Sequence, residues 1–229
     1  PVKITLEEKG PYRLTFRVDG KFCNKDGELF SCVSRMSFYA GSAEVNFEVR
    51  FINTYLKTEF NDFKSIILSY IPAVKPTALK MDNFTSDRIF QHHDKKLQIG
   101  DKFNTDRLSG SGSVKAGNNA ITFNLFKAAL RYPKAFSIDG NAVNFEILPA
   151  QPDKNFGDDL VYYLRFPLCE GFYRMKWGMG FRENITIDFA GKAPAAALSA
   201  EEVIAIVDRD YLADVNVYQG MQPRKITNF

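Results

Sequence analysis

Apolar and polar residues alternate one by one through much of the first 60 positions of the chain. The stretch YRLTFRVD places four residues on its apolar face: Tyr12, Leu14, Phe16 and Val18. The stretch AEVNFEVRF repeats the pattern with Val45, Phe47, Val49 and Phe51. Neighbouring side chains of a strand point to opposite faces, so this period predicts antiparallel strands with one face in water.

Short apolar segments of the same kind continue along the chain, and the 21 phenylalanines favour sheets over helices. The segments are DFKSIILSYIP, AITFNLF, AFSIDG, AVNFEILPA, LVYYLRFPL and ENITIDFAG. The period changes only in LSAEEVIAIVDRDYLAD, where Ser199 and Glu202 have the spacing of a helix capping box. We therefore predict an all-β fold, a large antiparallel β-sandwich over residues 1–192. A helix at 199–209 and a tail would form a second segment, residues 193–229.

Charge, length and motifs exclude several classes of function. The net charge is only +3 and the charges are scattered, which argues against a nucleic-acid partner. No apolar run approaches the roughly 18 residues of a membrane span. The chain has no glycine-rich phosphate loop, no GxSxG elbow and no HExxH, and its three cysteines and two histidines make no zinc pattern. We predict neither a cofactor nor a metal. The chain starts at Pro1 with no signal-like segment, as expected of a processed or excised piece.

Two cysteines flank an Asp-Gly turn in CNKDGELFSC. Cys23 and Cys32 would face each other across a hairpin and form a disulfide if the strand register allowed it. The alternative is two reduced strand residues.

The only histidines, His92 and His93, are adjacent. On a strand they would face opposite ways, so at most one looks into a given site. One interpretation is a solvated hairpin tip, since HHD precedes Lys95 and Lys96. The other is a histidine that transfers protons.

The segment FNLFKAALRYPKAF concentrates cations between two apolar runs, with Lys127, Arg131, Tyr132 and Lys134 close together. Pro133 restricts Tyr132 to an extended conformation, which stiffens the Tyr-Pro-Lys unit. An anion such as a carboxylate would find several cationic donors here. The alternative is a charged sheet rim.

The segment GFYRMKWGMGFREN combines aromatic residues with cations, including Arg174, the only tryptophan, Trp177, and Arg182. Aromatic faces pack against sugar rings, and cations pair with acidic groups. The alternatives are an aromatic edge that closes the core and a contact with another domain.

Four segments occur in an order that resembles the central β-sandwich domain of exo-acting rhamnogalacturonan lyases, polysaccharide lyase family 26. They are SRMSFYAGSAEVNFEVRFIN, DFKSIILSYIP, ITFNLFKAALRYPKAFSIDGNAVNFEILPAQ and GFRENITIDF. FYAGS and YPKAF followed by DG are the most specific parts. The resemblance covers roughly residues 3 to 190. It implies a supersandwich of the galactose mutarotase-like kind, preceded by a small β-barrel domain and followed by a helical one.

The resemblance also implies a function: β-elimination on a uronate-containing polysaccharide of the rhamnogalacturonan type. Such a reaction needs cations at the carboxylate and a base at the α-proton. The expected catalytic residues are His92, His93 and Tyr132. The expected substrate-binding residues are Lys127, Arg131, Lys134, Arg174, Trp177 and Arg182. The expected partners are an acidic polysaccharide or oligosaccharide and neighbouring domains of the same protein, and the expected location is secreted or periplasmic. Two alternatives stay open: a non-catalytic carbohydrate-binding module, and a structural scaffold that docks a neighbouring domain.

Overall fold

The computed structural model describes residues 2–25, 27–150, 168–169 and 171–192. The chain divides into two compact units, Pro1–Leu198 and Ser199–Phe229. The second unit, with the helix expected at 199–209, lies outside the described residues, as does most of LVYYLRFPL. The described part consists of antiparallel strands and contains no helix, so the predicted all-β antiparallel fold is confirmed. It therefore holds no helix that is long and apolar enough to cross a membrane.

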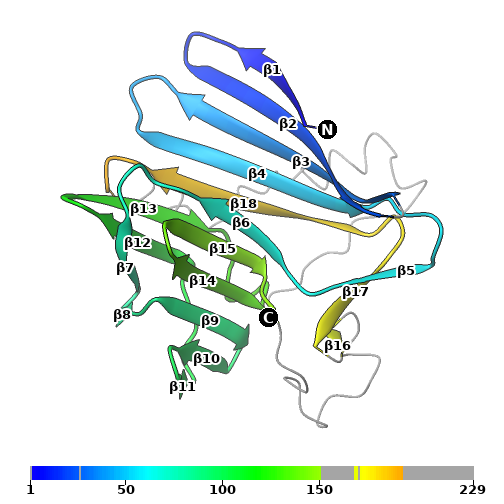
Figure 1. Cartoon of the computed structure of the whole chain (residues 1–229). Helices are drawn as coiled ribbons and strands as arrows, with labels where there is room; N and C mark the ends of the chain where they lie inside the picture. Colours follow the sequence, from blue (N-terminus) through cyan, green and yellow to red (C-terminus); the bar gives the residue numbers. More distant parts are fainter. Residues whose placement is uncertain (1, 26, 151–167, 170, 193–229) are drawn as a thin grey trace, which may run out of the picture. The chain divides into compact units, whose positions relative to one another are not determined.

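The strands form three sheets (Figure 1). The nine-stranded sheet runs, in spatial order, through β1 (Lys3–Lys9), β2 (Arg13–Asn24), β3 (Gly27–Tyr39), β4 (Glu44–Asn53), β18 (Gly180–Asp188), β13 (Asn119–Leu125), β12 (Ser111–Ala116), β7 (Pro76–Met81) and β8 (Phe84–Thr85). The six-stranded sheet runs through β11 (Lys102–Asn104), β10 (Lys96–Ile99), β9 (Arg88–His93), β14 (Lys134–Asp139), β15 (Ala142–Leu148) and β6 (Ile66–Tyr70). The three-stranded sheet consists of β16 (Leu168–Cys169), β17 (Phe172–Lys176) and β5 (Phe60–Phe63).

The alternating pattern of the N-terminal third sets the register of β2, β3 and β4. Leu14 lies opposite Phe38, which lies opposite Val45, so the apolar positions of the three strands share one face. Tyr12 is an exception, because β2 begins one residue later and Tyr12 is exposed.

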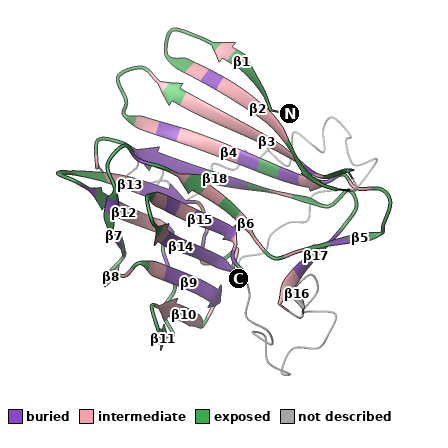
Figure 2. Ribbon diagram, in the orientation of Figure 1, coloured by how far each residue is buried: buried purple, intermediate pink, exposed green. Residues whose placement is uncertain are grey.

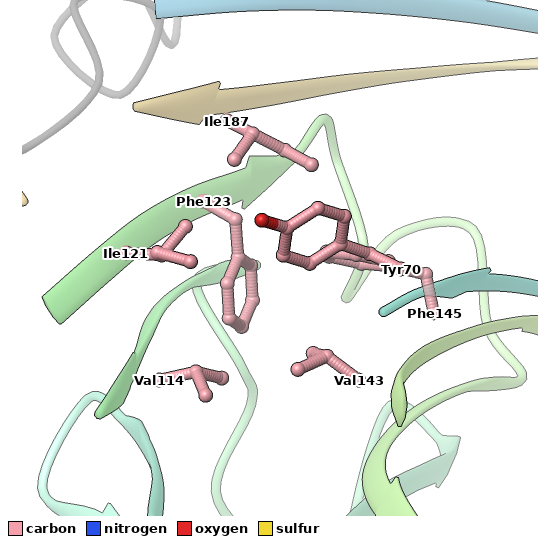
Figure 3. A pocket seen from close by; sticks show the side chains of 7 residues that line it. All are labelled: Tyr70, Val114, Ile121, Phe123, Val143, Phe145 and Ile187. Atoms are coloured by element: carbon pink, nitrogen blue, oxygen red, sulfur yellow. The ribbon is translucent and has the colours of Figure 1, made fainter. Parts of the chain in front are cut away.

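The core lies between the nine-stranded and six-stranded sheets. Buried apolar residues of β7, β12, β13 and β18 pack in one cluster with those of β9, β14 and β15, and these strands carry most of the buried positions in Figure 2. At its centre Phe123 stacks on Phe136, with ring centroids 5.4 Å apart, and meets the edge of Phe145 at 5.0 Å. A small apolar void remains beside them, lined by Tyr70, Val114, Ile121, Phe123, Val143, Phe145 and Ile187 (Figure 3).

The two cysteines beside the Asp-Gly turn are free thiols. Cys32 lies across from Gly20, whereas Cys23 lies across from Glu28. A register shift between Phe22 and Cys23 adds to this offset. The alternative of a disulfide is therefore not realised, because the pairing never brings the two cysteines opposite each other.

Candidate functional site

The cation-rich segment is the crossover between the two large sheets. Its residues 126–133 leave β13 of the nine-stranded sheet and enter β14 of the six-stranded sheet. The amide of Phe126 donates to the carbonyl of Asn184 at 3.1 Å. The Nη2 of Arg131 donates to the carbonyl of Arg182 at 2.7 Å. These bonds hold the crossover along β18, beyond the point where β13 stops pairing with that strand.

Two of the expected substrate-binding cations meet a carboxylate of the chain itself. The Nη1 of Arg131 lies 3.1 Å from Oε2 of Glu183, and the Nζ of Lys134 lies 3.3 Å from Oε1. We call Arg131, Lys134 and Glu183 the crossover ion cluster. Glu183 and Lys134 are each only 2 % exposed, whereas the Arg131 side chain is 37 % exposed. The cluster thus joins the two sheets at its buried end and reaches solvent through Arg131.

Lys134 is a buried ammonium group held by several acceptors. Besides Glu183, it donates to the carbonyl of Ile147 at 2.9 Å. Burial lowers the pKa of Lys134, and the charge of Glu183 acts in the opposite direction. The folded state therefore binds this proton less tightly than the unfolded state does.

The other two residues of the segment lie nearer the surface. Tyr132 is exposed and is joined to Pro133 by a cis peptide bond. Lys127 has a left-handed backbone with φ 53°, and its carbonyl accepts from the amides of Leu130 and Arg131, each at 3.0 Å. Its Nζ lies 4.9 Å from the centre of the Phe126 ring. On the crossover, Tyr132 is thus exposed and Lys127 partly exposed, whereas Lys134 is buried at its end.

We predict that Lys127→Gly raises the free energy of unfolding by about 0.5–1 kcal/mol. A left-handed backbone costs a residue with a Cβ atom roughly this much, and glycine adopts it freely. Urea denaturation would measure the change, with Lys102→Gly in the exposed strand β11 as control. There glycine should be destabilising. A loss of stability in both variants would contradict the prediction.

The histidines lie at an irregularity of β9, where the register shifts between Gln91 and His93. His92 is buried, stacks on Phe90 with ring centroids 3.6 Å apart, and has its Nε2 2.8 Å from Oε1 of Gln98. Gln91, its neighbour, lies opposite Lys134 on the other face. His93, the last residue of β9, lies opposite Lys96, so the shift places it on the same face as His92, contrary to the expectation from alternation. Its Nδ1 accepts from the amide of Lys95 at 3.3 Å and lies 3.6 Å from Asp94. His92 thus faces away from the crossover ion cluster.

The remaining expected binding residues are distributed over other surfaces. Arg174 of β17 forms two hydrogen bonds with Asp62 of β5, at 2.9 and 3.1 Å. Trp177 is half exposed in the turn between β17 and β18. Arg182 precedes Glu183 on β18, so it points to the opposite face, where it pairs with Glu48 at 3.6 Å.

Glu183, which pairs with both Arg131 and Lys134, was not among the residues expected from the sequence. The pattern does contain a signal, because Phe181, Glu183, Ile185 and Ile187 alternate and share the core face of β18. A carboxylate at a core position requires a buried partner. Within the described residues, no three His, Cys, Asp or Glu side chains lie together as metal ligands would.

Comparison with known proteins gives structural neighbours only. No family model and no curated protein matches the sequence. Solved structures with a similar arrangement include a putative aldose 1-epimerase from Escherichia coli K12 (7 % identity, 81 % of this chain, 68 % of that chain, TM-score 0.43). A protein from Synechocystis shows 10 % identity over 84 % of this chain and 66 % of its own, with TM-score 0.43. A galactose mutarotase-like protein from Lactobacillus casei shows 10 % identity over 81 % and 72 %, with TM-score 0.37. This chain spans about two thirds of the length of these proteins.

Proposed function

We propose that this chain is a carbohydrate-binding β-sandwich domain whose crossover segment binds the carboxylate of an acidic sugar. The observation that carries the proposal is the composition of the crossover ion cluster. Two cations, Arg131 and Lys134, share the single carboxylate of Glu183, and the Arg131 side chain reaches solvent. Arginine is always charged in proteins and offers five N–H donors in a planar fork. A uronate carboxylate approaching from solvent would meet a partly desolvated guanidinium in an environment of net positive charge.

In its more specific form, the proposal follows the resemblance to rhamnogalacturonan lyases. The domain would then belong to a polysaccharide lyase-like protein that cleaves a uronate-containing chain by β-elimination. Tyr132 lies on the same crossover and is exposed, so it is the side chain we propose for the proton transfer. Neighbouring domains would supply the rest of the cleft.

The test is a binding titration by calorimetry with oligogalacturonate and rhamnogalacturonan oligosaccharides, and with a neutral oligosaccharide for comparison. We expect Arg131→Gln to weaken binding of the acidic sugars by about 10-fold or more, because a charge-assisted contact is lost. The matched control is Arg13→Gln, which removes an arginine paired with Glu8 on the exposed face of β2. Its effect should stay within about twofold. Equal loss in both variants, or no preference for the acidic sugars, would refute the proposal.

A structural brace is the second candidate function of the cluster, favoured by the burial of Glu183 and Lys134. A pure brace predicts that Arg131→Gln lowers stability and that the wild-type chain binds no uronate. The lyase form has its own test, the absorbance of the unsaturated product formed from rhamnogalacturonan. If product appears, Tyr132→Phe should abolish it; product formation that survives this substitution would exclude Tyr132 as the base.

A further inference from the structure

One face of the N-terminal half of the nine-stranded sheet is apolar across four strands. The register places on this face every second residue of β1, β2, β3 and β4. We call it the N-terminal inner face. Its hydrophilic members are Ser34, the buried Asn53 opposite Phe30, and Lys9, which a register shift in β1 places opposite Leu14. Its residues are Ile4, Leu6, Lys9, Leu14, Phe16, Val18, Gly20, Phe22, Phe30, Cys32, Ser34, Met36, Phe38, Val45, Phe47, Val49, Phe51 and Asn53.

The opposite face of the same strands is a ladder of ion pairs. Arg35 pairs with Glu7 at 2.6 Å and with Glu48 at 3.4 Å, and Arg17 pairs with Asp19 at 2.6 Å. The hydrogen bond from Arg35 lowers the pKa of Glu7. These charges are paired with each other within the sheet and are suited to water. The two faces therefore have the polarity of a sheet with one solvated side and one side that packs on another layer.

The N-terminal inner face is incompletely covered. Toward β18 its residues are buried, as Val49 and Phe51 are, but toward the edge of the sheet they are exposed (Figure 2). Ile4 is 67 % exposed, Leu6 46 %, Phe22 50 % and Phe38 38 %. With about 200 Å² for each large apolar side chain, these four and their partly buried neighbours leave roughly 600–700 Å² of apolar surface in water. A patch of this size exceeds what most monomeric proteins expose.

We propose that the N-terminal inner face is the contact face of a two-fold symmetric dimer of this chain. A standard interface buries about 800 Å² on each partner, close to the area available here. In a two-fold dimer the same patch meets itself, and its central residues carry no charge, since Lys9 lies at the end of the edge strand β1. The β1–β4 strands of two copies would then close into a sandwich, with apolar layers facing inward and ion-pair ladders facing water.

The experiment is sedimentation equilibrium of the full chain over a range of concentrations. We expect a monomer–dimer equilibrium in the wild type. Leu6→Lys should weaken the dimer by about 100-fold or more, because it buries an ammonium group that has no counterion in the interface. Thr5→Lys is the matched control, since it adds the same charge to the next residue of β1, which faces the ion-pair ladder. This variant should keep the wild-type equilibrium.

Thiol labelling provides a readout that does not depend on a variant folding. Cys32 belongs to the N-terminal inner face, and Cys23 is an exposed reference. As the protein concentration rises, alkylation of Cys32 should slow by at least about 10-fold relative to Cys23, because the dimer covers it. A chain that stays monomeric up to about 100 μM, or a Thr5→Lys variant that dissociates as readily as Leu6→Lys, would overturn the proposal. In that case another domain or another partner covers this face.

Discussion

Replacing Glu183 by glutamine is expected to lower the free energy of unfolding by about 3–5 kcal/mol. The substitution keeps the shape of the side chain but leaves the ammonium group of Lys134, which is buried, without its carboxylate. Arg131 loses less, because its side chain reaches solvent. Urea denaturation at neutral pH would measure the change.

The control for this prediction is Glu48→Gln on β4. Glu48 also contacts two arginines, Arg35 at 3.4 Å and Arg182 at 3.6 Å, but its side chain is partly exposed. Surface ion pairs contribute about 1 kcal/mol at most, so this variant should be only slightly destabilised. If the two variants lost equal stability, burial would not govern the energetics of the crossover ion cluster.

The pH dependence gives the same prediction a second readout. The pKa of Lys134 in the folded state lies below the ordinary value of 10.5. Between these two pKa values the unfolded chain holds a proton that the folded chain has released, so stability rises as pH rises through this window. Glu183 raises the pKa of Lys134, so its loss lowers the folded-state pKa further. The pH range between the folded-state and unfolded-state pKa values therefore becomes wider. The destabilisation by Glu183→Gln should therefore be smaller at pH about 9.5 than at pH 7.

A double variant separates the loss of the pair from the cost of an isolated charge. Adding Lys134→Met to Glu183→Gln removes the buried ammonium group and replaces it with an apolar side chain of similar length. Exchanging a whole buried pair for apolar groups is often close to neutral. The double variant should recover much of the lost stability; failure to do so would mean that the backbone contact of Lys134 with Ile147 matters more than its charge.

The second large effect is expected from Phe123→Ala, at about 3–5 kcal/mol of lost stability. The ring of Phe123 is buried, stacks on Phe136 and meets the edge of Phe145. It also borders the apolar void, as Figure 3 shows, so its removal enlarges a space that already exists. The paired strands of two sheets surround this space and limit its collapse. Thermal or urea unfolding would measure the loss.

Two comparisons make the Phe123 prediction specific. Phe103→Ala removes a largely exposed ring from β11 and should cost about 1 kcal/mol or less. The cavity left by Phe123→Ala is apolar, so a small apolar molecule such as benzene should bind there and raise the melting temperature of this variant but not of the wild type. A Phe123→Ala variant as stable as Phe103→Ala would show that the core repacks around the missing ring.

Local patterns were sufficient for those features that depend on neighbouring residues. The alternation in YRLTFRVD and AEVNFEVRF predicted which side chains of β2 and β4 share a face, because the pleat of a strand repeats every two residues whatever the strand pairs with. The same rule did not hold for His92 and His93, because a register shift in β9 interrupts the alternation between Gln91 and His93. It also failed at Tyr12, where a strand boundary interrupts the alternation. Strand boundaries depend on the partner strand as well as on the local pattern.

The sequence by itself determined an antiparallel β fold, the two faces of its N-terminal strands and the clustering of Lys127, Arg131, Tyr132 and Lys134 on one segment. Only the tertiary structure decided what these cations contact. Glu183 lies 49 positions after Lys134, and the two meet because the crossover returns along β18 as it passes from one sheet to the other. It also decided that Cys23 and Cys32 stay free thiols and that His92 is the buried histidine. Side-chain alternation is a property of one strand, whereas ion pairing and burial depend on which distant strands become neighbours, and no local period encodes that choice.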